Sequence, residues 1–179
     1  MTPAIRVWHP ACHSPPKTKP NLPIVDVSKY RNYAHALAAH MDDAGLIVLE
    51  HDVTISTLDL HTLMLWANPT DMIAVSYWLY PVSTGLPEPV IAHRRRGEFL
   101  RSVPTEWTAV DRCGLGCTYL PPSIKATLDR GLRLGAEWDY PALDTTLSAA
   151  WNERPARIWV PPKLFADHKH GWIDTKLPT

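Results

Sequence analysis

The sequence lacks a net charge, a disulfide framework and a long apolar run, and each absence excludes a class of protein. Lysine plus arginine and aspartate plus glutamate both number 18 in the 179 residues, so the basic excess of a general nucleic-acid binder is missing. Three cysteines are an odd number without a disulfide framework, which favours a reducing cytoplasm. No apolar stretch approaches the roughly 20 residues that a membrane span needs, and no signal-peptide pattern opens the chain. We therefore expect a cytoplasmic protein without a membrane span, with residues 1–179 forming a single domain.

Proline and tryptophan, by contrast, are abundant. The chain has 18 prolines and 8 tryptophans, and the prolines predict fixed loops rather than disorder because apolar residues occur throughout. Residues 10–25 are the longest such segment, which we interpret as a proline-rich loop. Four tryptophans are expected in the core, with the alternative that one of them stacks on a sugar ring or a base: Trp78, Trp107, Trp138 and Trp151.

The hydrophobic pattern predicts strands that alternate with helices. Strands are expected at residues 5–8, 46–50, 72–80, 90–93 and 157–160. Helices are expected after Ser28, from Thr54 to about Ala67, after Ser123, and from Leu143 to Trp151. This alternation predicts an α/β sheet that is parallel at least in its first half.

The triplet Glu50-His51-Asp52 directly follows the apolar run Leu46–Leu49. Such a run predicts a buried parallel strand, and ligands in open α/β sheets bind beyond the carboxyl ends of the strands. Two carboxylates at that position suit a hard divalent cation with a phosphate partner. The alternative is a charged turn that only ends the strand.

Further segments follow in an order that is typical of one family. Four segments together resemble nucleotide-sugar glycosyltransferases of the GT-A fold. They are the stretch from Tyr30-Arg31-Asn32 to the acidic triplet, the glycine-containing stretch Cys113–Cys117, the acidic stretch Tyr140–Ser148 and the terminal His168-Lys169-His170. Small bacteriophage-encoded proteins of this type are the nearest pattern. The resemblance covers roughly residues 26–172. The short loop at residues 10–25 replaces a longer nucleotide-binding half, so the fold that it implies is a compact, abbreviated GT-A-like mixed sheet flanked by helices.

The resemblance implies a metal-dependent transferase that moves a sugar from a nucleotide-diphosphate donor to a macromolecular acceptor, either a virion protein or a modified DNA base. It implies Mn²⁺ or Mg²⁺ as cofactor and the host cytoplasm as location. The residues that it implies for the metal are Asp52, Glu50, His168 and His170, with residues 167–179 folding back over the site. Those for the nucleotide sugar are His9, Arg31, Glu50 and Asp52. Asp144 is implied as the catalytic base, with Asp139 competing for that role. Apart from the resemblance, the basic cluster Arg94, Arg95 and Arg96 is a candidate for acceptor binding, since it could hold a pyrophosphate, a phosphorylated acceptor or DNA.

Each of these assignments has an alternative. Asp144 at a helix start is also favoured as a simple cap, and the terminal histidines as a solvated tail. The arginine cluster is more typical of a solvated edge than of a binding site. Zinc binding by Cys113 and Cys117 with Cys12 is disfavoured by the spacing. At the level of function, the alternatives are a catalytically silent GT-A-like binding module and a DNA-binding or DNA-modifying protein that uses Arg94–Arg96.

Overall fold

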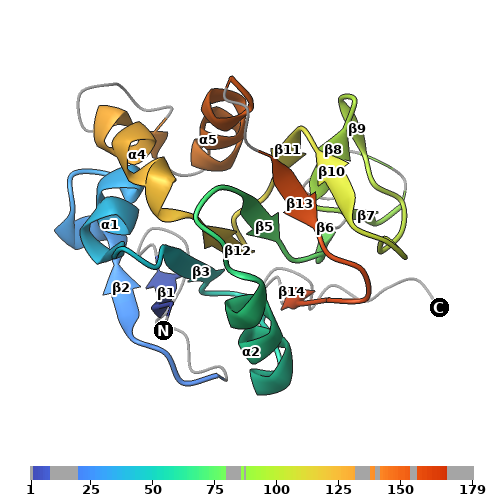
Figure 1. Ribbon diagram of the computed structural model, residues 1–179, viewed down its shortest axis with the longest axis horizontal. Helices are drawn as coiled ribbons and strands as arrows, with labels where there is room; N and C mark the ends of the chain where they lie inside the picture. Colours follow the sequence, from blue (N-terminus) through green and yellow to red (C-terminus); the bar gives the residue numbers. More distant parts are fainter. Residues whose placement is uncertain are drawn as a thin grey trace.

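The centre of the fold is a seven-stranded mixed sheet with the strand order β10-β13-β5-β12-β3-β1-β2 (Figure 1). The computed structural model describes residues 2–8, 20–79, 86, 88–131, 138–139, 142–153 and 157–168. The strands of this sheet are β1 (Ala4–Trp8), β2 (Ile24–Asp26), β3 (Leu46–Glu50), β5 (Met72–Ala74), β10 (Thr108–Val110), β12 (Cys117–Leu120) and β13 (Ile158–Val160).

Most strands of the sheet share one direction. β1 pairs in parallel with both β2 and β3, and β13 pairs in parallel with β5. β12 lies antiparallel between β3 and β5, and β10 closes the other edge antiparallel to β13. The expected parallel first half is thus confirmed. The carboxyl ends of β1, β3 and β5 therefore meet at one edge of the sheet.

Helices cover both faces of the sheet. The helices α1 (Tyr33–His40), α4 (Lys125–Gly131) and α5 (Leu143–Asn152) lie on one face, and α2 (Thr57–Trp66) lies on the other (Figure 1). Alternate residues of β3 join the two cores: Leu46 and Val48 pack on the first face, Ile47 and Leu49 on the second. Burial on both faces explains why this strand reads as a continuous apolar run.

Short strands and turns build the rest of the molecule. β4 (Val53–Thr54) pairs with β14 (Asp167–His168), and β6 (Trp78–Leu79) pairs with β7 (Val90–Ile91). β8 (His93–Arg95) lies between β9 (Glu98–Phe99) and β11 (Arg112–Cys113). Two 3-10 turns, Val27–Lys29 and Pro122–Ile124, precede α1 and α4.

Several boundaries differ from the predicted ones because local capping groups decide them. Asn32 caps α1 by accepting a hydrogen bond from the His35 N–H at 2.8 Å, so Ser28 is not the cap. Ser56, whose hydroxyl accepts from the Asp59 N–H at 3.0 Å, caps α2. Thr54, the predicted cap, belongs to β4 instead.

Two predicted segments are also divided. The expected strand at residues 72–80 breaks after Ala74, because Ser76 leaves the sheet to form a bridge with Phe165. The predicted loop at residues 10–25 ends two residues early, since β2 begins at Ile24 and pairs with β1; residues 9–19 lie outside the described part.

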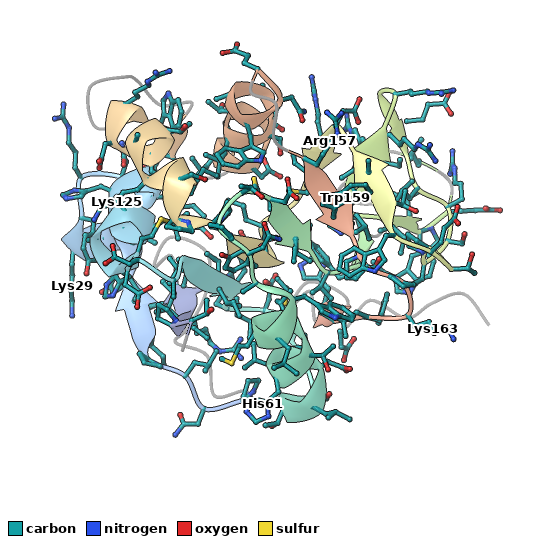
Figure 2. All side chains as sticks on the ribbon, viewed as in Figure 1. Lys29, His61, Lys125, Arg157, Trp159 and Lys163 are labelled. Carbon is teal, nitrogen blue, oxygen red and sulfur yellow. The ribbon has the colours of Figure 1, made fainter. Side chains whose placement is uncertain are left out.

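The surface of the molecule is polar on several sides. Lys29, Lys125 and Lys163 are exposed and project from three different parts of the fold (Figure 2). Within the described ranges, no helix combines the length and the apolar character needed to cross a bilayer.

Candidate functional site

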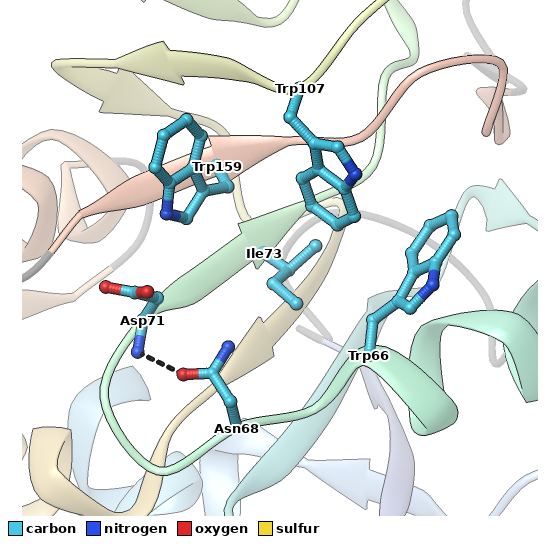
Figure 3. Close-up of a pocket in the computed structure, with 6 residues that line it drawn as sticks. All are labelled: Trp66, Asn68, Asp71, Ile73, Trp107 and Trp159. Carbon is cyan, nitrogen blue, oxygen red and sulfur yellow. Dashed lines mark hydrogen bonds between the residues drawn. The ribbon is translucent and has the colours of Figure 1, made fainter.

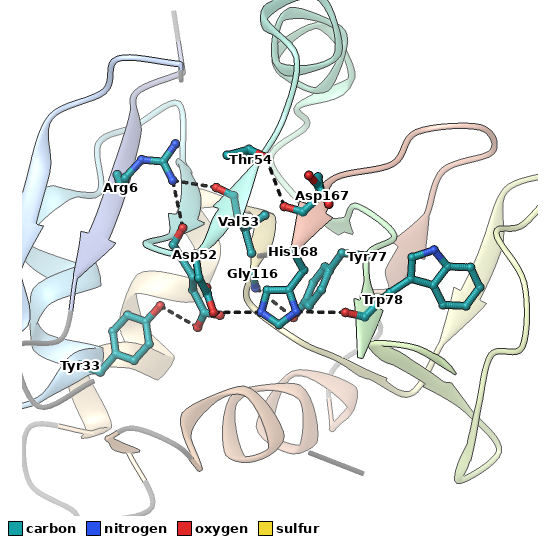
Figure 4. Close-up of polar contacts among 11 residues, drawn as sticks. Arg6, Tyr33, Asp52, Val53, Thr54, Tyr77, Trp78, Gly116, Asp167 and His168 are labelled. Atoms are coloured by element: carbon teal, nitrogen blue, oxygen red, sulfur yellow. Dashed lines mark hydrogen bonds and ion pairs between the residues drawn. The ribbon is translucent and has the colours of Figure 1, made fainter. Parts of the chain in front are cut away.

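The acidic triplet lies at the carboxyl end of β3, where the sheet's parallel strands end. The backbone N–H of Glu50 donates to the carbonyl of Gly116 at 2.9 Å. A guanidinium nitrogen of Arg6 donates to the carbonyls of Glu50 and Val53, at 3.1 and 2.7 Å (Figure 4). Arg6 is only 1% exposed. A buried charge therefore fixes the turn that presents the two carboxylates.

His168 reaches this turn because β14 pairs with β4, with His168 opposite Val53. Its Nδ1 lies 3.0 Å from the carbonyl oxygen of Trp78, and its Nε2 lies 3.1 Å from Oδ2 of Asp52 (Figure 4). A carbonyl only accepts, so Nδ1 carries the hydrogen and Nε2 is the nitrogen directed at Asp52. This is the orientation in which metal-ligating histidines are commonly held.

The charges of this pair stabilise each other. Burial alone lowers the pKa of His168, but the hydrogen bond and charge of Asp52 outweigh it, and the pKa is raised above its ordinary value. Burial alone raises the pKa of Asp52, but the hydrogen bond and charge of His168 lower it below its ordinary value. The contact thus favours the imidazolium form of His168 and the carboxylate form of Asp52, relative to isolated side chains.

The surroundings of Glu50 disfavour its ionised form, in contrast to those of Asp52. Burial, followed by the charges of Asp52 and Asp144, raises the pKa of Glu50 to about 8. The hydroxyl of Tyr33 donates to Oε1 of Glu50 at 3.4 Å and offsets only part of this effect. The charges of two other carboxylates thus disfavour the ionised form of Glu50, and a cation would relieve this repulsion.

Asp144 lies in the first turn of α5, as predicted. Burial raises the pKa of its carboxyl, and the hydrogen bond from the Thr145 N–H at 2.6 Å and the charges of Arg94 and Arg112 offset that effect only in part. Asp139 accepts from the Tyr33 N–H at 3.0 Å, at the start of α1. Asp144 thus lies close enough to Glu50 for its charge to act there, whereas one oxygen of Asp139 anchors a helix.

The arginine cluster divides between two environments. Arg94 lies opposite Arg112 in the β8–β11 pairing, and its guanidinium carbon lies 4.1 Å from the centre of the Phe99 ring. Arg95 is exposed, and Arg96 has a positive φ of 54° in the β8–β9 turn. Arg94 is consequently the member of the cluster whose charge reaches Asp144.

The predicted glycine stretch makes room for Tyr77. The Gly116 N–H donates to the Tyr77 hydroxyl at 3.2 Å. A Cβ atom at Gly116 would lie 2.6 Å from the Tyr77 ring, which is closer than real Cβ contacts allow. The Tyr77 ring in turn meets the His168 ring edge-on, with centroids 5.1 Å apart. The glycine is therefore needed for the packing that supports His168.

The remaining predicted residues are not part of this cluster as described. Arg31 is exposed before α1, and among the described residues no contact joins it to the acidic pair. His9 and His170 lie outside the described residues. Cys113 and Cys117 are buried in the cores of opposite sheet faces, and burial raises the pKa of both thiols to about 12; Cys12 also lies outside the described ranges.

Sequence reasoning missed three supporting residues. Arg6, Tyr33 and Tyr77 contact the acidic turn or His168 directly. Arg6 had a detectable signal, because a charge inside the apolar stretch Ile5–Val7 must find a buried partner. The two tyrosines had none, since an aromatic residue at helical or strand spacing usually belongs to the core.

The donor set for a metal is small. In the part of the chain that the structure describes, no group of three or more histidine, cysteine, aspartate or glutamate side chains is arranged to hold a metal ion. Asp52 and His168 provide one oxygen and one nitrogen within 3.1 Å of each other. Two protein ligands suit a cation that a phosphate-bearing ligand completes, rather than a closed all-protein site.

Comparison with solved structures shows a similarity at the level of the fold. The structure is similar to the crystal structure of A197 from STIV, with a TM-score of 0.61 and 16% sequence identity over 95% of this chain and 86% of that chain. The sequence matches no protein-family model and no curated protein. At this identity the likeness supports a shared mixed α/β architecture and nothing finer.

Proposed function

We propose that this protein is a metal-dependent glycosyltransferase of the GT-A type, which transfers a sugar from a nucleotide diphosphate to a macromolecular acceptor. The observation that carries the proposal is the position of His168. Its Nδ1 is occupied by the Trp78 carbonyl, and its Nε2 is directed at Asp52 beyond the carboxyl end of β3. A carboxylate and an oriented imidazole at that edge suit a cation that also binds a diphosphate.

In this proposal, Asp52 and His168 hold Mn²⁺ or Mg²⁺ directly, and Glu50 acts on the cation through water. The cation would supply positive charge to the diphosphate oxygens as the sugar–phosphate bond breaks. Tyr33 orients Glu50 through the 3.4 Å hydrogen bond, and Arg6 holds the backbone of the turn. These contacts fix the ligands before the donor binds, which lowers the entropy cost of binding.

Asp144 is the residue that we assign as the base for the acceptor hydroxyl. Its raised pKa makes it a better proton acceptor than an ordinary aspartate, and it lies close enough to Glu50 to affect its charge. An inverting reaction needs such a base and a retaining reaction does not. We assign the acceptor side to the region next to β8, because the charge of Arg94 acts on Asp144.

Donor binding is the direct test of this proposal. Thermal unfolding is measured with a panel of nucleoside diphosphates and nucleotide sugars, with and without Mn²⁺. A true donor stabilises the native state by mass action, by about 2.7 kcal/mol at a concentration of 100 Kd. We expect stabilisation by at least one nucleotide that requires Mn²⁺.

The isosteric variant Asp52→Asn should lose the Mn²⁺-dependent part of that stabilisation. The matched control is Asp43→Asn, because Asp43 is an exposed aspartate on the same chain segment. An unchanged titration in Asp52→Asn would refute the metal assignment. Tight donor binding without sugar transfer or donor hydrolysis would favour the silent binding module instead.

A further inference from the structure

A pocket lies on the face of the sheet that α2 covers, and three tryptophans line it. Trp66 ends α2, Trp107 precedes β10 and Trp159 lies on β13. Ile73 of β5 forms the floor, beside Trp159 in the β5–β13 pairing (Figure 3). The pocket has a volume of about 300 Å³ and is open to solvent. Trp107, which was expected in the core, is 42% exposed here, and Trp66 and Trp159 are half-buried.

The pocket is separate from the acidic turn. Asn68 and Asp71, which form its rim, precede β5, whereas Glu50 and Asp52 follow the carboxyl end of β3. Because β3 and β5 run in the same direction, the positions before β5 and after β3 lie at opposite ends of the sheet's strands. A ligand in this pocket therefore needs neither the cation nor the nucleotide of the proposed transfer reaction.

The polar rim is fixed by hydrogen bonds. The side-chain oxygen of Asn68 accepts from the Thr70 N–H at 3.0 Å and from the Asp71 N–H at 2.8 Å. That leaves its amide nitrogen as a donor, which Figure 3 shows turned toward the pocket. Oδ1 of Asp71 accepts from the Arg157 N–H at 2.9 Å, so its other oxygen remains an acceptor within the described structure.

We propose that this pocket is a carbohydrate-binding site that takes an uncharged sugar ring. The C–H faces of a sugar pack on indole rings, and its hydroxyls need both a donor and an acceptor at the rim, which Asn68 and Asp71 provide. The carboxylate of Asp71 repels acidic sugars and phosphates. The inference is independent of the proposed transferase function.

The angles between the rings favour a sugar over a flat base. The rings of Trp66 and Trp107 contact each other with centroids 4.9 Å apart and planes at 67°. The two rings thus form an angled wall and not a parallel-sided slot. A puckered sugar ring can contact both planes, while a nucleobase stacks best against one flat face.

The test is ligand-observed NMR and fluorescence titration in the presence of a chelator. The probes are glucose, galactose, mannose, N-acetylglucosamine, maltose and cellobiose, with uridine and guanosine as flat comparators. We expect saturable binding of at least one sugar. Trp107→Ala should weaken it at least about tenfold, Trp107→Phe should weaken it less, and Asp71→Asn should weaken it because one acceptor becomes a donor.

Two control variants keep the result specific to the pocket. Leu65→Ala alters a side chain that is 84% exposed and adjacent to Trp66 in the chain but does not line the pocket, so sugar binding should be unchanged. Asp52→Asn should leave sugar binding intact as well, which separates this proposal from the transferase. Absence of saturable sugar binding, binding that survives Trp107→Ala unchanged, or binding of the nucleosides alone would overturn it.

Discussion

Glu50 and His168 hold protons in the folded chain that the unfolded chain releases at lower pH. The pKa of Glu50 rises from 4.5 to about 8, with burial as the largest cause. The pKa of His168 also rises, through Asp52. A group whose pKa is raised by folding stabilises the native state fully below its unfolded pKa, and that stabilisation is lost as the pH rises through its folded pKa. Asp52, whose pKa is lowered, acts only toward the acid end.

The contribution of Glu50 to the free energy of unfolding should therefore decrease as the pH rises from about 5 to about 8, whereas His93, whose pKa burial lowers to about 4, contributes in the opposite direction below its ordinary pKa of 6.5. Glu50→Gln removes the Glu50 contribution alone, so the free energy of unfolding of this variant should fall less with rising pH than that of the parent protein. Urea denaturation at pH 5, 6, 7 and 8 measures this. The exposed residue Glu98 supplies a control, since Glu98→Gln should keep the slope of the parent protein. Equal slopes for Glu50→Gln and the parent would contradict the assignment of the raised pKa.

At the scale of elements, the two-residue strand β14 has a role that its length does not suggest. Its pairing with β4 sets His168 opposite Val53. The Ala166 N–H donates to the Ser76 carbonyl at 2.8 Å immediately before it. The strand and the residue before it are thus held by β4, which follows the acidic turn, and by Ser76, which precedes Tyr77. A short ladder is sufficient here because the chain on its N-terminal side is already anchored.

Removal of residues 167–179 should weaken cation-dependent nucleotide binding at least as much as His168→Ala does. The truncation removes both the imidazole and the ladder that positions it, whereas the substitution removes only the imidazole. Isothermal titration with Mn²⁺ and the nucleotide found in the donor screen measures both variants. Circular dichroism verifies that each remains folded. Full binding by the truncated chain would show that the segment has no part in the site.

At the scale of the whole molecule, the balance of charge bears on the acceptor. Lysine plus arginine and aspartate plus glutamate are equal at 18, and the basic side chains next to Asp144 are Arg94 and Arg112. Such a surface contacts few phosphates. The slope of log K against log salt is about −0.9 for each phosphate contact on duplex DNA. DNA binding should consequently be weak and should vanish as the salt concentration rises.

We accordingly predict a protein acceptor rather than DNA. The measurement is transfer of a labelled sugar to a mixture of both acceptors, followed by separate digestion with nuclease and protease. Label that protease releases and nuclease leaves intact agrees with the prediction, and Arg94→Ala should then reduce transfer. Label released by nuclease alone would contradict the prediction of a protein acceptor. It would assign Arg94, Arg95 and Arg96 to DNA contact.

The tryptophans illustrate where sequence reasoning on composition succeeds and fails. Trp138 and Trp151 are buried at 5% and 1% exposure, as expected for core residues. Trp107 is exposed and lines a pocket with Trp66 and Trp159, which are distant in the chain. Nothing in the local pattern distinguishes the two groups, because exposure depends on which helix covers each part of the sheet.

Local pattern was sufficient for β1, β3, β13, the helices and the acidic end of β3, but it did not predict the short strands β2, β4 and β14. A run of apolar residues identifies a strand that is buried on both faces, and this property is visible in a few consecutive residues. Caps were less predictable, since several serines, threonines and asparagines compete near each helix start, and the backbone geometry decides among them. For that reason the N-caps of α1 and α2 are Asn32 and Ser56, and not the predicted Ser28 and Thr54.

The sequence by itself determined the α/β alternation, the parallel first half and the position of Glu50 and Asp52 at a strand end. Only the tertiary structure decided that His168 bonds Asp52, that Asp144 lies close to Glu50 and that Arg6 holds the turn. The physical reason is the sequence separation: His168 and Asp52 lie 116 residues apart, and their contact depends on the β4–β14 ladder. The charges that shift the pKa of Glu50 likewise come from separate elements. Their combined effect exists only once the sheet, α5 and β14 are assembled.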